Sequence, residues 1–230
     1  MDAVIKIGGS LSQNPEQLKA LCTQISKLAR EYAIAVVPGG GPFADTVRDF
    51  DRRFALSSIL AHKMGILGMD QYGLALTQIT PNSCATYLFS YTKQIAETGA
   101  VPIFLPSQLM FREDPLENSW DVTSDSIAAY VADRLSANKL LLATDVDGIF
   151  TKDPKKHTDA TLIEHLTAAE LLKLNKRTSV DRNLPKLLLK STINCYVVNG
   201  NYPERLKAIL AGQHAKCTLI TAQTKIKTKP

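Results

Sequence analysis

Short apolar runs that stop abruptly at glycines alternate with amphipathic segments along this chain. The first run, Val4 to Ile7, ends at Gly8-Gly9 and is typical of a buried strand. Residues 15–32 then carry apolar side chains at helical spacing, which predicts an amphipathic helix. A second apolar run, Ala33 to Val37, stops at a proline and three glycines. A strand, a helix and a strand in so short a stretch predict a βαβ unit with a right-handed crossover.

The same alternation continues along the rest of the chain. Strands that alternate with helices form a mainly parallel sheet that is covered by helices on both faces. We therefore expect an α/β fold over residues 1–230, a three-layer αβα sandwich in one domain, with no linker and no internal repeat. Further strands are predicted at 101–105, 139–143, 195–198 and 218–220, and helices at 42–53, 57–79, 124–135, 167–174, 181–190 and 203–210.

Composition excludes several classes of protein. The chain has 230 residues, of which 45% are hydrophobic and 21% charged, and this is ordinary for a globular domain. Its four cysteines form no Cys-x-x-Cys pair, so we expect neither disulfides nor a structural zinc site. No apolar run approaches the length of a membrane span and no signal segment precedes the first strand, so we expect a cytoplasmic protein that has no membrane partner.

The formal charge of +5 allows two kinds of partner. Nucleic acid is one of them. However, three of the lysines lie in the last six residues, Lys225 to Pro230, and a basic tail of this kind is usually just solvated. The remaining excess of positive charge suits an anionic small ligand. We therefore expect a small-molecule partner and no nucleic acid.

Two glycine-rich segments, Lys6 to Ser10 and Pro38 to Asp45, have the composition of anion-binding loops. Both follow predicted strands, and ligands in open α/β sheets bind beyond the carboxyl ends of the strands. Paired glycines expose N–H groups that can form an anion nest, and a glycine run that enters a helix adds the positive end of the helix dipole. Lys6, inside an apolar strand, needs an anion, which is either a ligand or a nearby carboxylate.

Two common nucleotide-binding patterns are not satisfied. Gly39, Gly41 and Ala44 match a loose G-x-G-x-x-A dinucleotide pattern. That pattern needs an acidic residue at the end of the next strand, and a helix is predicted there instead. The sequence G-x-x-x-x-G-K-[ST] does not occur in the chain, so the protein is not a P-loop kinase.

Three later segments carry polar residues at predicted element ends. Around residues 123–126, Thr123 or Asp125 could serve only to cap a helix. The segment Ala143 to Pro154 is rich in turn formers and lacks the spacing of an EF-hand. We expect it to hold a nucleotide, with Phe150 near the base and Lys152 near a phosphate.

The last of these segments is Asp181 to Lys186. Asp181 is the expected N-cap of a helix, and Pro185 lies within its first turn. Lys186 then lies near the positive end of the helix dipole, which is unfavourable for a cation. A functional role would explain this position, and so would a solvated place on the surface.

Taken in order, these segments resemble those of the amino-acid kinase superfamily, and together they cover nearly the whole chain. Each is weakly specific alone, whereas the ordered set is specific. The resemblance implies an ATP-dependent kinase with the amino-acid-kinase fold, Mg²⁺ carried on the ATP phosphates without direct protein ligands, and a homo-oligomer. The matching segments are Lys6-x-Gly8-Gly9-Ser10, Pro38-Gly39-Gly40-Gly41, Ser124-Asp125, Thr144-Asp145-Val146-Asp147-Gly148 and Pro185-Lys186.

Within this superfamily, residues 119–129 and 68–72 are similar to the branch that acts in methanofuran biosynthesis. Kinases of that branch phosphorylate [5-(aminomethyl)furan-3-yl]methyl phosphate to the diphosphate. Kinases of isopentenyl phosphate or UMP share the fold and stay open as alternatives. A non-catalytic nucleotide sensor is an alternative of another class, and it would be expected to lack Lys6 or Lys186. One departure is Cys217-Thr218, where the family tends to have Gly-Thr.

The resemblance also implies catalytic roles. Lys6 would contact the transferred phosphoryl group from the acceptor side and Lys186 from the ATP side, and Asp125 would orient both lysines. A phosphate acceptor is already anionic, so no general base is needed, and the chemistry consists of positioning and charge neutralisation. The residues expected to bind ATP are Lys6, Gly8, Gly9, Ser10, Thr144, Asp145, Gly148, Phe150, Lys152, Asp153 and Lys186.

Residues 1–135 are expected to hold the acceptor and the phosphate loops, residues 136–220 the ATP, and residues 221–230 a basic tail. Asp121 could pair with an aminomethyl cation, whereas His62, Met64 and Met69 could equally be core residues. The apolar stretch Ser57 to Ile79 is either part of the acceptor site or an oligomer interface. The residues expected to bind the acceptor are Gly40, Gly41, His62, Met64, Met69, Trp120, Asp121 and Thr123.

Overall fold

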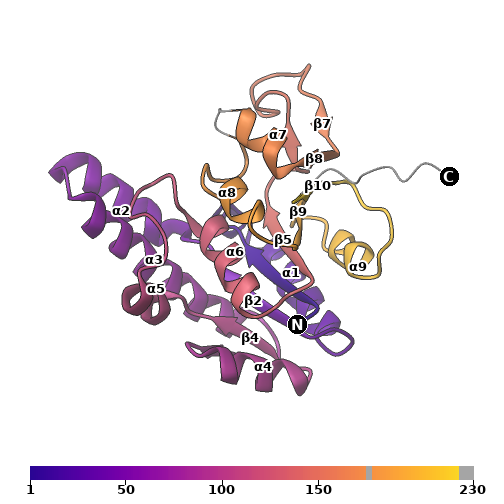
Figure 1. Cartoon of the computed structure of the whole chain (residues 1–230). Coiled ribbons are helices and arrows are strands. Elements are labelled where there is room, and N and C mark those ends of the chain that lie inside the picture. Colours follow the sequence, from indigo (N-terminus) through magenta and orange to yellow (C-terminus); the bar gives the residue numbers. More distant parts are fainter. Residues whose placement is uncertain (175–177, 223–230) are drawn as a thin grey trace.

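The computed structural model describes residues 1–174 and 178–222, so residues 223–230 of the expected basic tail lie outside the described part. The described residues form an eight-stranded sheet with helices on both sides (Figure 1). Every described pairing in this sheet is parallel except that of β10 with β9. The prediction of a mainly parallel αβα sandwich is thereby confirmed. In the described residues, no helix has the length and apolar character needed to cross a membrane.

The strand order in the main sheet is β3-β4-β2-β1-β5-β9-β10-β8, and β6 and β7 form a separate hairpin. The first strand of the chain therefore lies in the middle of the sheet, where neighbours on both sides fix it. The strands are β1 (Ala3–Ile7), β2 (Ile34–Pro38), β3 (Ser83–Thr86), β4 (Val101–Phe104), β5 (Lys139–Thr144), β6 (Ile149–Phe150), β7 (Leu162–Ile163), β8 (His165–Thr167), β9 (Asn194–Asn199) and β10 (Cys217–Thr221).

The helices begin and end close to the predicted positions in most cases. The helix expected at 15–32 ends earlier, and the one expected at 181–190 is much shorter. The helices are η1 (Gly9–Gln13), α1 (Pro15–Leu28), α2 (Gly41–Phe54), α3 (Ser58–Ile79), α4 (Phe89–Glu97), α5 (Ser107–Glu113), α6 (Ser124–Arg134), α7 (Ala168–Lys173), α8 (Leu184–Leu188) and α9 (Glu204–Leu210).

Alternation along β1 divides the core into two layers. Ile5 and Ile7 belong to a cluster that also contains buried residues of α1 and α9. Val4 belongs to a second cluster, built from residues of α6, α7 and α8 on the opposite face of the sheet. Successive side chains of a strand point to opposite faces, so Lys6 shares the α6 face with Val4. The sequence of β1 therefore directs one lysine toward the N-terminus of α6.

The long helix α3 contributes to both layers of the core. Ile66 and Met69 belong to the cluster of α6, and Tyr72 and Leu76 to the cluster of α1. Its glycines do not interrupt it, because close packing replaces the missing side chains. At Gly68, for example, an added Cβ would lie 3.0 Å from the backbone nitrogen of Ala44 in α2. α3 thus holds α2 near the carboxyl ends of the strands.

Several elements were not predicted from the sequence, namely the strands β3, β6, β7 and β8 and the helices η1, α4 and α5. The segment of β3, Ser83–Thr86, has no apolar run, and this strand forms one edge of the sheet. The other missed strands have two or three residues each. Elements this short depend on tertiary pairing more than on their own sequence pattern.

Candidate active site

Lys6 and Asp125 form a buried ion pair at the carboxyl end of β1. The Nζ atom of Lys6 lies 2.8 Å from Oδ1 of Asp125, and the two residues are 8% and 5% exposed. Asp125 is in the first turn of α6, where the helix dipole favours a carboxylate. This contact supplies the nearby carboxylate that sequence analysis kept as the alternative to a ligand. The same lysine also lines a cavity, so it is available to a ligand as well.

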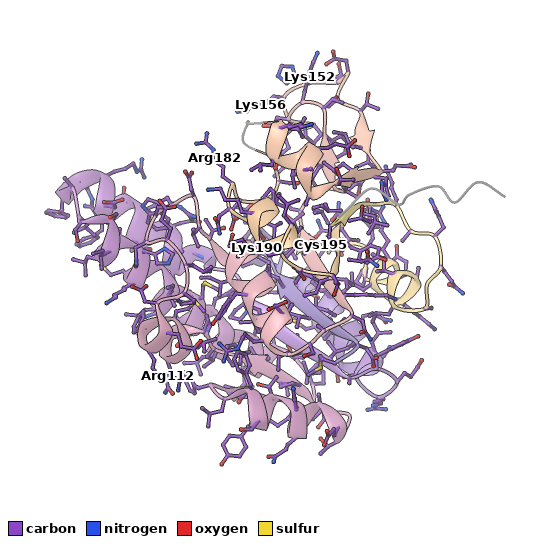
Figure 2. All side chains as sticks on the ribbon, viewed as in Figure 1. Arg112, Lys152, Lys156, Arg182, Lys190 and Cys195 are labelled. Carbon is purple, nitrogen blue, oxygen red and sulfur yellow. The ribbon has the colours of Figure 1, made fainter. Side chains whose placement is uncertain are left out.

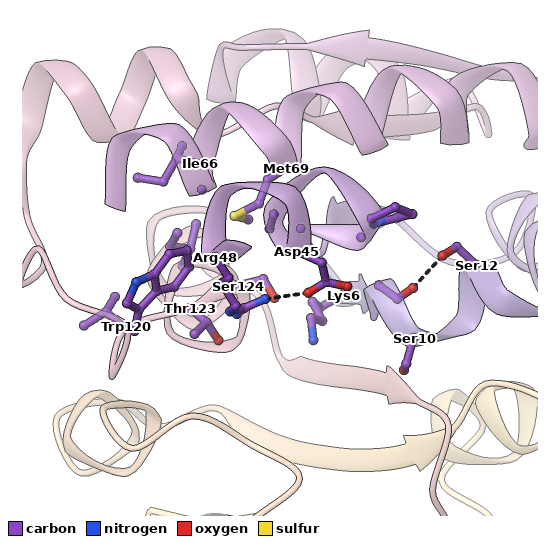
Figure 3. Close-up of a pocket in the computed structure, with 18 of the residues that line it drawn as sticks. Lys6, Ser10, Ser12, Asp45, Arg48, Ile66, Met69, Trp120, Thr123 and Ser124 are labelled. Carbon is purple, nitrogen blue, oxygen red and sulfur yellow. Dashed lines mark hydrogen bonds and ion pairs between the residues drawn. The ribbon is translucent and has the colours of Figure 1, made fainter. Parts of the chain in front are cut away.

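That cavity has a volume of about 530 Å³ and opens above the carboxyl ends of the strands. Figure 3 shows side chains from β1, η1, α2 and α3 and from the segment before α6 around it. Its lining is more polar than the core, and it combines backbone loops with charged groups. Of the predicted residues, those that line it are Lys6, Gly9, Ser10, Gly40, Gly41, His62, Met69, Trp120 and Thr123.

The two glycine loops pack backbone against backbone. A Cβ on Gly9 would lie 2.5 Å from the backbone nitrogen of Gly41, which is closer than real Cβ contacts come. Gly41 itself has a φ of +56°, a left-handed conformation that favours glycine. The N-cap of α2, Gly40, has no side chain to bond the first N–H groups of the helix. A positive helix end without a side-chain cap therefore faces the same cavity as Lys6.

Asp181 joins the start of α8 to the start of α6. Its carboxylate accepts six hydrogen bonds, which come from the backbone and hydroxyl groups of Thr123 and Ser126 and from the backbone of Asn183 and Leu184. Its own N–H donates to Oδ2 of Asp125 at 3.1 Å. Burial and then the charge of Asp125 raise the pKa of Asp181, although the hydrogen bonds act to lower it.

This network corrects one local prediction. Asp181 was expected to be the N-cap of a helix that runs to Lys190, but the N-cap is Asn183 and the helix spans only Leu184–Leu188. The carboxylate of Asp181 does satisfy N–H groups at the helix start, from two residues further back. The hydrogen bonds that Asp181 accepts from Thr123 and Ser126 keep this residue outside helix α8.

One wall of the cavity is formed by Trp120. Its indole N–H donates to Asp51 at 2.7 Å, and the guanidinium of Arg48 lies 4.6 Å from the ring centroid. Arg48 also donates to Asp45 at 2.9 Å. Gly65 in α3 leaves room for the ring, since an added Cβ would lie 3.4 Å from it. Hydrogen bonds, stacking and packing thus fix the position of the indole at the cavity.

His62 lines the same cavity in one defined tautomer. Its Nδ1 lies 3.2 Å from the backbone oxygen of Ser119. A carbonyl oxygen can only accept, so Nδ1 carries the hydrogen and Nε2 is an acceptor when the ring is neutral. Burial lowers the pKa of His62 and outweighs the opposing effects of Ser119 and Asp114, which favours the neutral ring.

The segment after β5 lies beside the first glycine loop. A Cβ on Gly8 would come 2.7 Å from the backbone oxygen of Ala143, at the end of β5. Asp145 forms an ion pair with Lys155. Burial acts to raise the pKa of Asp145, but the contacts with Lys155 and further hydrogen bonds together outweigh burial and leave the pKa lowered.

Other residues of the expected nucleotide loop have partners within the loop or beyond it. Lys152 pairs with Asp159, and Asp153 accepts from the backbone of Lys155 at 3.0 Å. Gly148 packs tightly against Thr218, whose hydroxyl accepts from the backbone of Ile149 at 2.7 Å. The departure at residues 217–218 therefore leaves a close-packed loop. Phe150 lies in β6 and is partly buried.

Lys186, Asp121 and Met64 are among the predicted residues that do not line the cavity of Lys6. Lys186 is exposed and lines a smaller cavity of about 240 Å³ with residues of α7. Asp121 is 59% exposed in its side chain, and its oxygen lies 3.7 Å from Arg182. Met64 is on a different face of α3 from the lining residues of that helix. In the described residues, Asp125 contacts Lys6 but makes no ion pair with Lys186.

A third cavity, of about 780 Å³, connects these regions. It shares Asp45, Arg48, Trp120 and Thr123 with the cavity of Lys6, and it shares Asp121 and residues 178 and 180–182 with the cavity of Lys186. Among the described residues, no group of three or more His, Cys, Asp or Glu side chains gathers in a way that could hold a metal ion.

Comparison with known proteins shows which family and fold the chain has. The sequence model of the Amino acid kinase family matches residues 1–199. The chain belongs to the amino acid kinase family. It is 37% identical over 225 residues to the [5-(aminomethyl)furan-3-yl]methyl phosphate kinase of Methanocaldococcus jannaschii. The matched residues cover 97% of this chain and 99% of that protein. It is 26% identical over 235 residues to the uridylate kinase of Pyrococcus abyssi, with 95% and 99% covered.

Two solved structures, of a uridylate kinase and a UMP kinase, share the fold. The crystal structure of uridylate kinase from Archaeoglobus fulgidus matches with a TM-score of 0.77 at 24% identity, over 96% of this chain and all of that one. The UMP kinase from Bacillus anthracis matches with a TM-score of 0.75 at 20% identity, over 97% and 96%. The family and the kinase class predicted from the sequence are confirmed.

The residue that sequence analysis undervalued most is Asp181. It was seen only as a cap for its own helix, whereas four of its six bonds come from Thr123 and Ser126 in another segment. Arg48 and Asp45, which line the cavity, were not singled out as ligands at all. Their spacing on α2 is also that of an ordinary surface ion pair, so the sequence offered no signal.

We predict that Asp181→Asn destabilises the protein, because an amide nitrogen then faces N–H and O–H donors. The free energy of unfolding should fall by about 2–4 kcal/mol, the scale for unsatisfied buried partners. Urea denaturation followed by circular dichroism measures it. Asp133→Asn, at an exposed position of α6, is the control and should stay within about 0.5 kcal/mol of wild type. Equal effects of the two variants would contradict the role given to Asp181.

Proposed function

We propose that this protein transfers the γ-phosphoryl group of ATP to [5-(aminomethyl)furan-3-yl]methyl phosphate and forms the diphosphate. The observation that carries this proposal is the 37% identity, over nearly the full length of both chains, to the M. jannaschii kinase of that name. An acceptor phosphate oxygen forms the new bond to the γ-phosphorus. The bond from that phosphorus to the bridging oxygen breaks, and ADP leaves. The acceptor is already anionic and needs no general base.

In this proposal, the glycine loops hold the phosphate groups. The uncapped start of α2 lines the cavity together with Gly9 and Ser10 of the loop after β1, and these parts would form an anion-binding wall with the ammonium of Lys6 beside it. The N–H of Gly8 already donates to the backbone oxygen of Ala143. Gly40 and Gly41 face the acceptor, and Gly8, Gly9 and Ser10 face ATP. Mg²⁺, bound to the β and γ phosphates, would neutralise charge on the nucleotide.

The remaining roles are distributed around these loops. We propose that Asp125 orients Lys6, and that Lys186 approaches the transferred group from the ATP side through the connected cavities. Asp181 supports this arrangement, because it links the helix of Lys186 to the helix of Asp125. Residues proposed for the nucleotide are Thr144, Asp145, Gly148, Phe150, Lys152 and Asp153; those proposed for the acceptor side chain are His62, Met69, Trp120 and Thr123.

The acceptor is tested by an assay of ADP release over a panel of phosphomonoesters. The panel contains the aminomethylfuran phosphate, UMP and isopentenyl phosphate, each with Mg²⁺ and ATP. We expect kcat/KM to be highest for the aminomethylfuran phosphate, by about tenfold or more, because polar groups built for one substrate reject others. A higher kcat/KM for UMP or isopentenyl phosphate would contradict the proposed acceptor, but the protein would still be a kinase.

We predict that Lys6→Ala lowers kcat by about 10²–10³, the scale for loss of one donor to the transition state. Lys6→Arg should also lower kcat, because a planar guanidinium does not replace a compact ammonium. Removing Lys6 leaves Asp125 buried without its partner, so the double variant Lys6→Ala/Asp125→Ala serves as a control for folding. Circular dichroism checks the fold of each variant. An unchanged kcat in Lys6→Ala would remove the lysine from the mechanism.

We also propose that the protein is a homo-oligomer through the outer faces of α2 and α3. Large apolar side chains are exposed there, among them Phe54, Ile59 and Leu74. Exposed apolar patches often mark protein–protein contacts. Light scattering should give a mass above 25.2 kDa for the wild type and a lower mass for Phe54→Glu/Leu74→Glu. A monomeric wild type would contradict the proposal.

A further inference from the structure

Several arginines line the cavity that connects Lys6 to Lys186, and they differ in how firmly they are held. Arg48 is fixed by Asp45 at 2.9 Å and by stacking on Trp120, and Arg52 is fixed by Asp49 at 3.1 Å. The polar partner of Arg182 in the described part of the chain is Asp121, with Nη1 and Oδ1 3.7 Å apart. That distance exceeds a hydrogen bond. Of the arginines that line this cavity, Arg182 therefore has the guanidinium with the weakest contact to a carboxylate.

The backbone of Arg182 is held in place although its side chain is not. The preceding residue, Asp181, is bonded to α6 and to the start of α8. The side chain of Arg182 is 60% exposed, and Figure 2 shows it projecting from the segment before α8. It lines the cavity that contains Asp125 and also the one that contains Lys186. Arg182 therefore lines both the cavity of Lys186 and the cavity that adjoins the one of Lys6.

The chemistry of the site calls for more positive charge than the lysines supply. Phosphoryl transfer between ATP and a phosphate acceptor brings two polyanions together. The charge of Lys6 is already balanced by Asp125. The wall of the connecting cavity has more carboxylates than guanidinium groups: it carries Asp45, Asp51, Asp121, Asp125 and Asp181 against Arg48, Arg52 and Arg182. A guanidinium offers parallel N–H groups that bind two phosphate oxygens at once, which an ammonium cannot do.

We propose that Arg182 is a further catalytic residue, which leaves Asp121 and binds the oxygens of the transferred phosphoryl group when ATP is present. It stays protonated throughout and exchanges no proton. The new oxygen–phosphorus bond forms on the acceptor phosphate, the bond to the bridging oxygen breaks, and ADP carries away the electron pair. The inference rests on the proposed phosphoryl transfer but not on which phosphate is the acceptor.

The test compares binding of two nucleotides by calorimetry in the presence of Mg²⁺ and without an acceptor. AMP-PNP has a group in the γ position, and ADP lacks it. We expect Arg182→Ala to bind AMP-PNP about tenfold more weakly than wild type, the scale of a lost charge-assisted hydrogen bond. Its affinity for ADP should stay within about twofold, because no γ group is present to lose the contact. Arg182→Lys should fall between wild type and Arg182→Ala for AMP-PNP.

The matched control is Arg112→Ala. Arg112 has a side chain that is 65% exposed and a neighbouring carboxylate at 3.2 Å, but it lies on α5 and lines none of these cavities. This control should bind both nucleotides as the wild type does. In turnover with the best acceptor of the panel, Arg182→Ala should lower kcat by about 10²-fold, as for loss of one transition-state donor.

Three outcomes are distinguishable. Unchanged affinity for AMP-PNP and unchanged kcat in Arg182→Ala would overturn the inference and leave the proposed kinase function in place. Equal losses for AMP-PNP and ADP would also overturn it, since the contact would then be to the phosphates that ADP retains. A wild type that binds neither nucleotide would overturn the proposed function together with this inference.

Discussion

The site is organised around the buried ion pair of Lys6 and Asp125. An ammonium so deep in an apolar strand requires a partner, and the partner comes from the first turn of α6 on the facing layer. Asp125 in turn accepts from the backbone of Asp181, which lies just before α8. One lysine thereby links the central strand to two helices that are distant in sequence. This arrangement keeps a positive charge at the cavity without leaving it unpaired.

The glycines of the site have two physical functions that act together. They let the loops after β1 and β2 touch each other, since a Cβ on Gly9 would meet the backbone of Gly41. The same close packing brings the loop after β1 and the start of α2 to the wall of one cavity, where glycine loops can bind an anion. The glycine-rich composition of the two loops predicted the second function. Steric contact between the loops became visible only when the structure placed them side by side.

The parts of the fold that could be predicted were those with local signals. Apolar runs that end before glycines predicted the strands β1 and β2. The order of the glycine-rich and polar segments along the chain indicated the family. The partners of Asp181 could not be predicted, because four of its bonds come from residues about 55 positions away. Asp121, expected at the acceptor, is instead exposed beside Arg182. The contacts of Asp181 and the exposure of Asp121 depend on burial and on pairing between distant segments. A short stretch of sequence does not indicate either.

The most direct test of the central claim is a crystal structure with AMP-PNP, Mg²⁺ and the aminomethylfuran phosphate. We expect the Nζ atoms of Lys6 and Lys186 to lie on opposite sides of the γ group, each about 3 Å from one of its oxygens. Lys186 lines a separate cavity in the free protein, so this result requires the two cavities to close on the phosphates. A complex in which Lys186 stays away from the γ group would contradict the account.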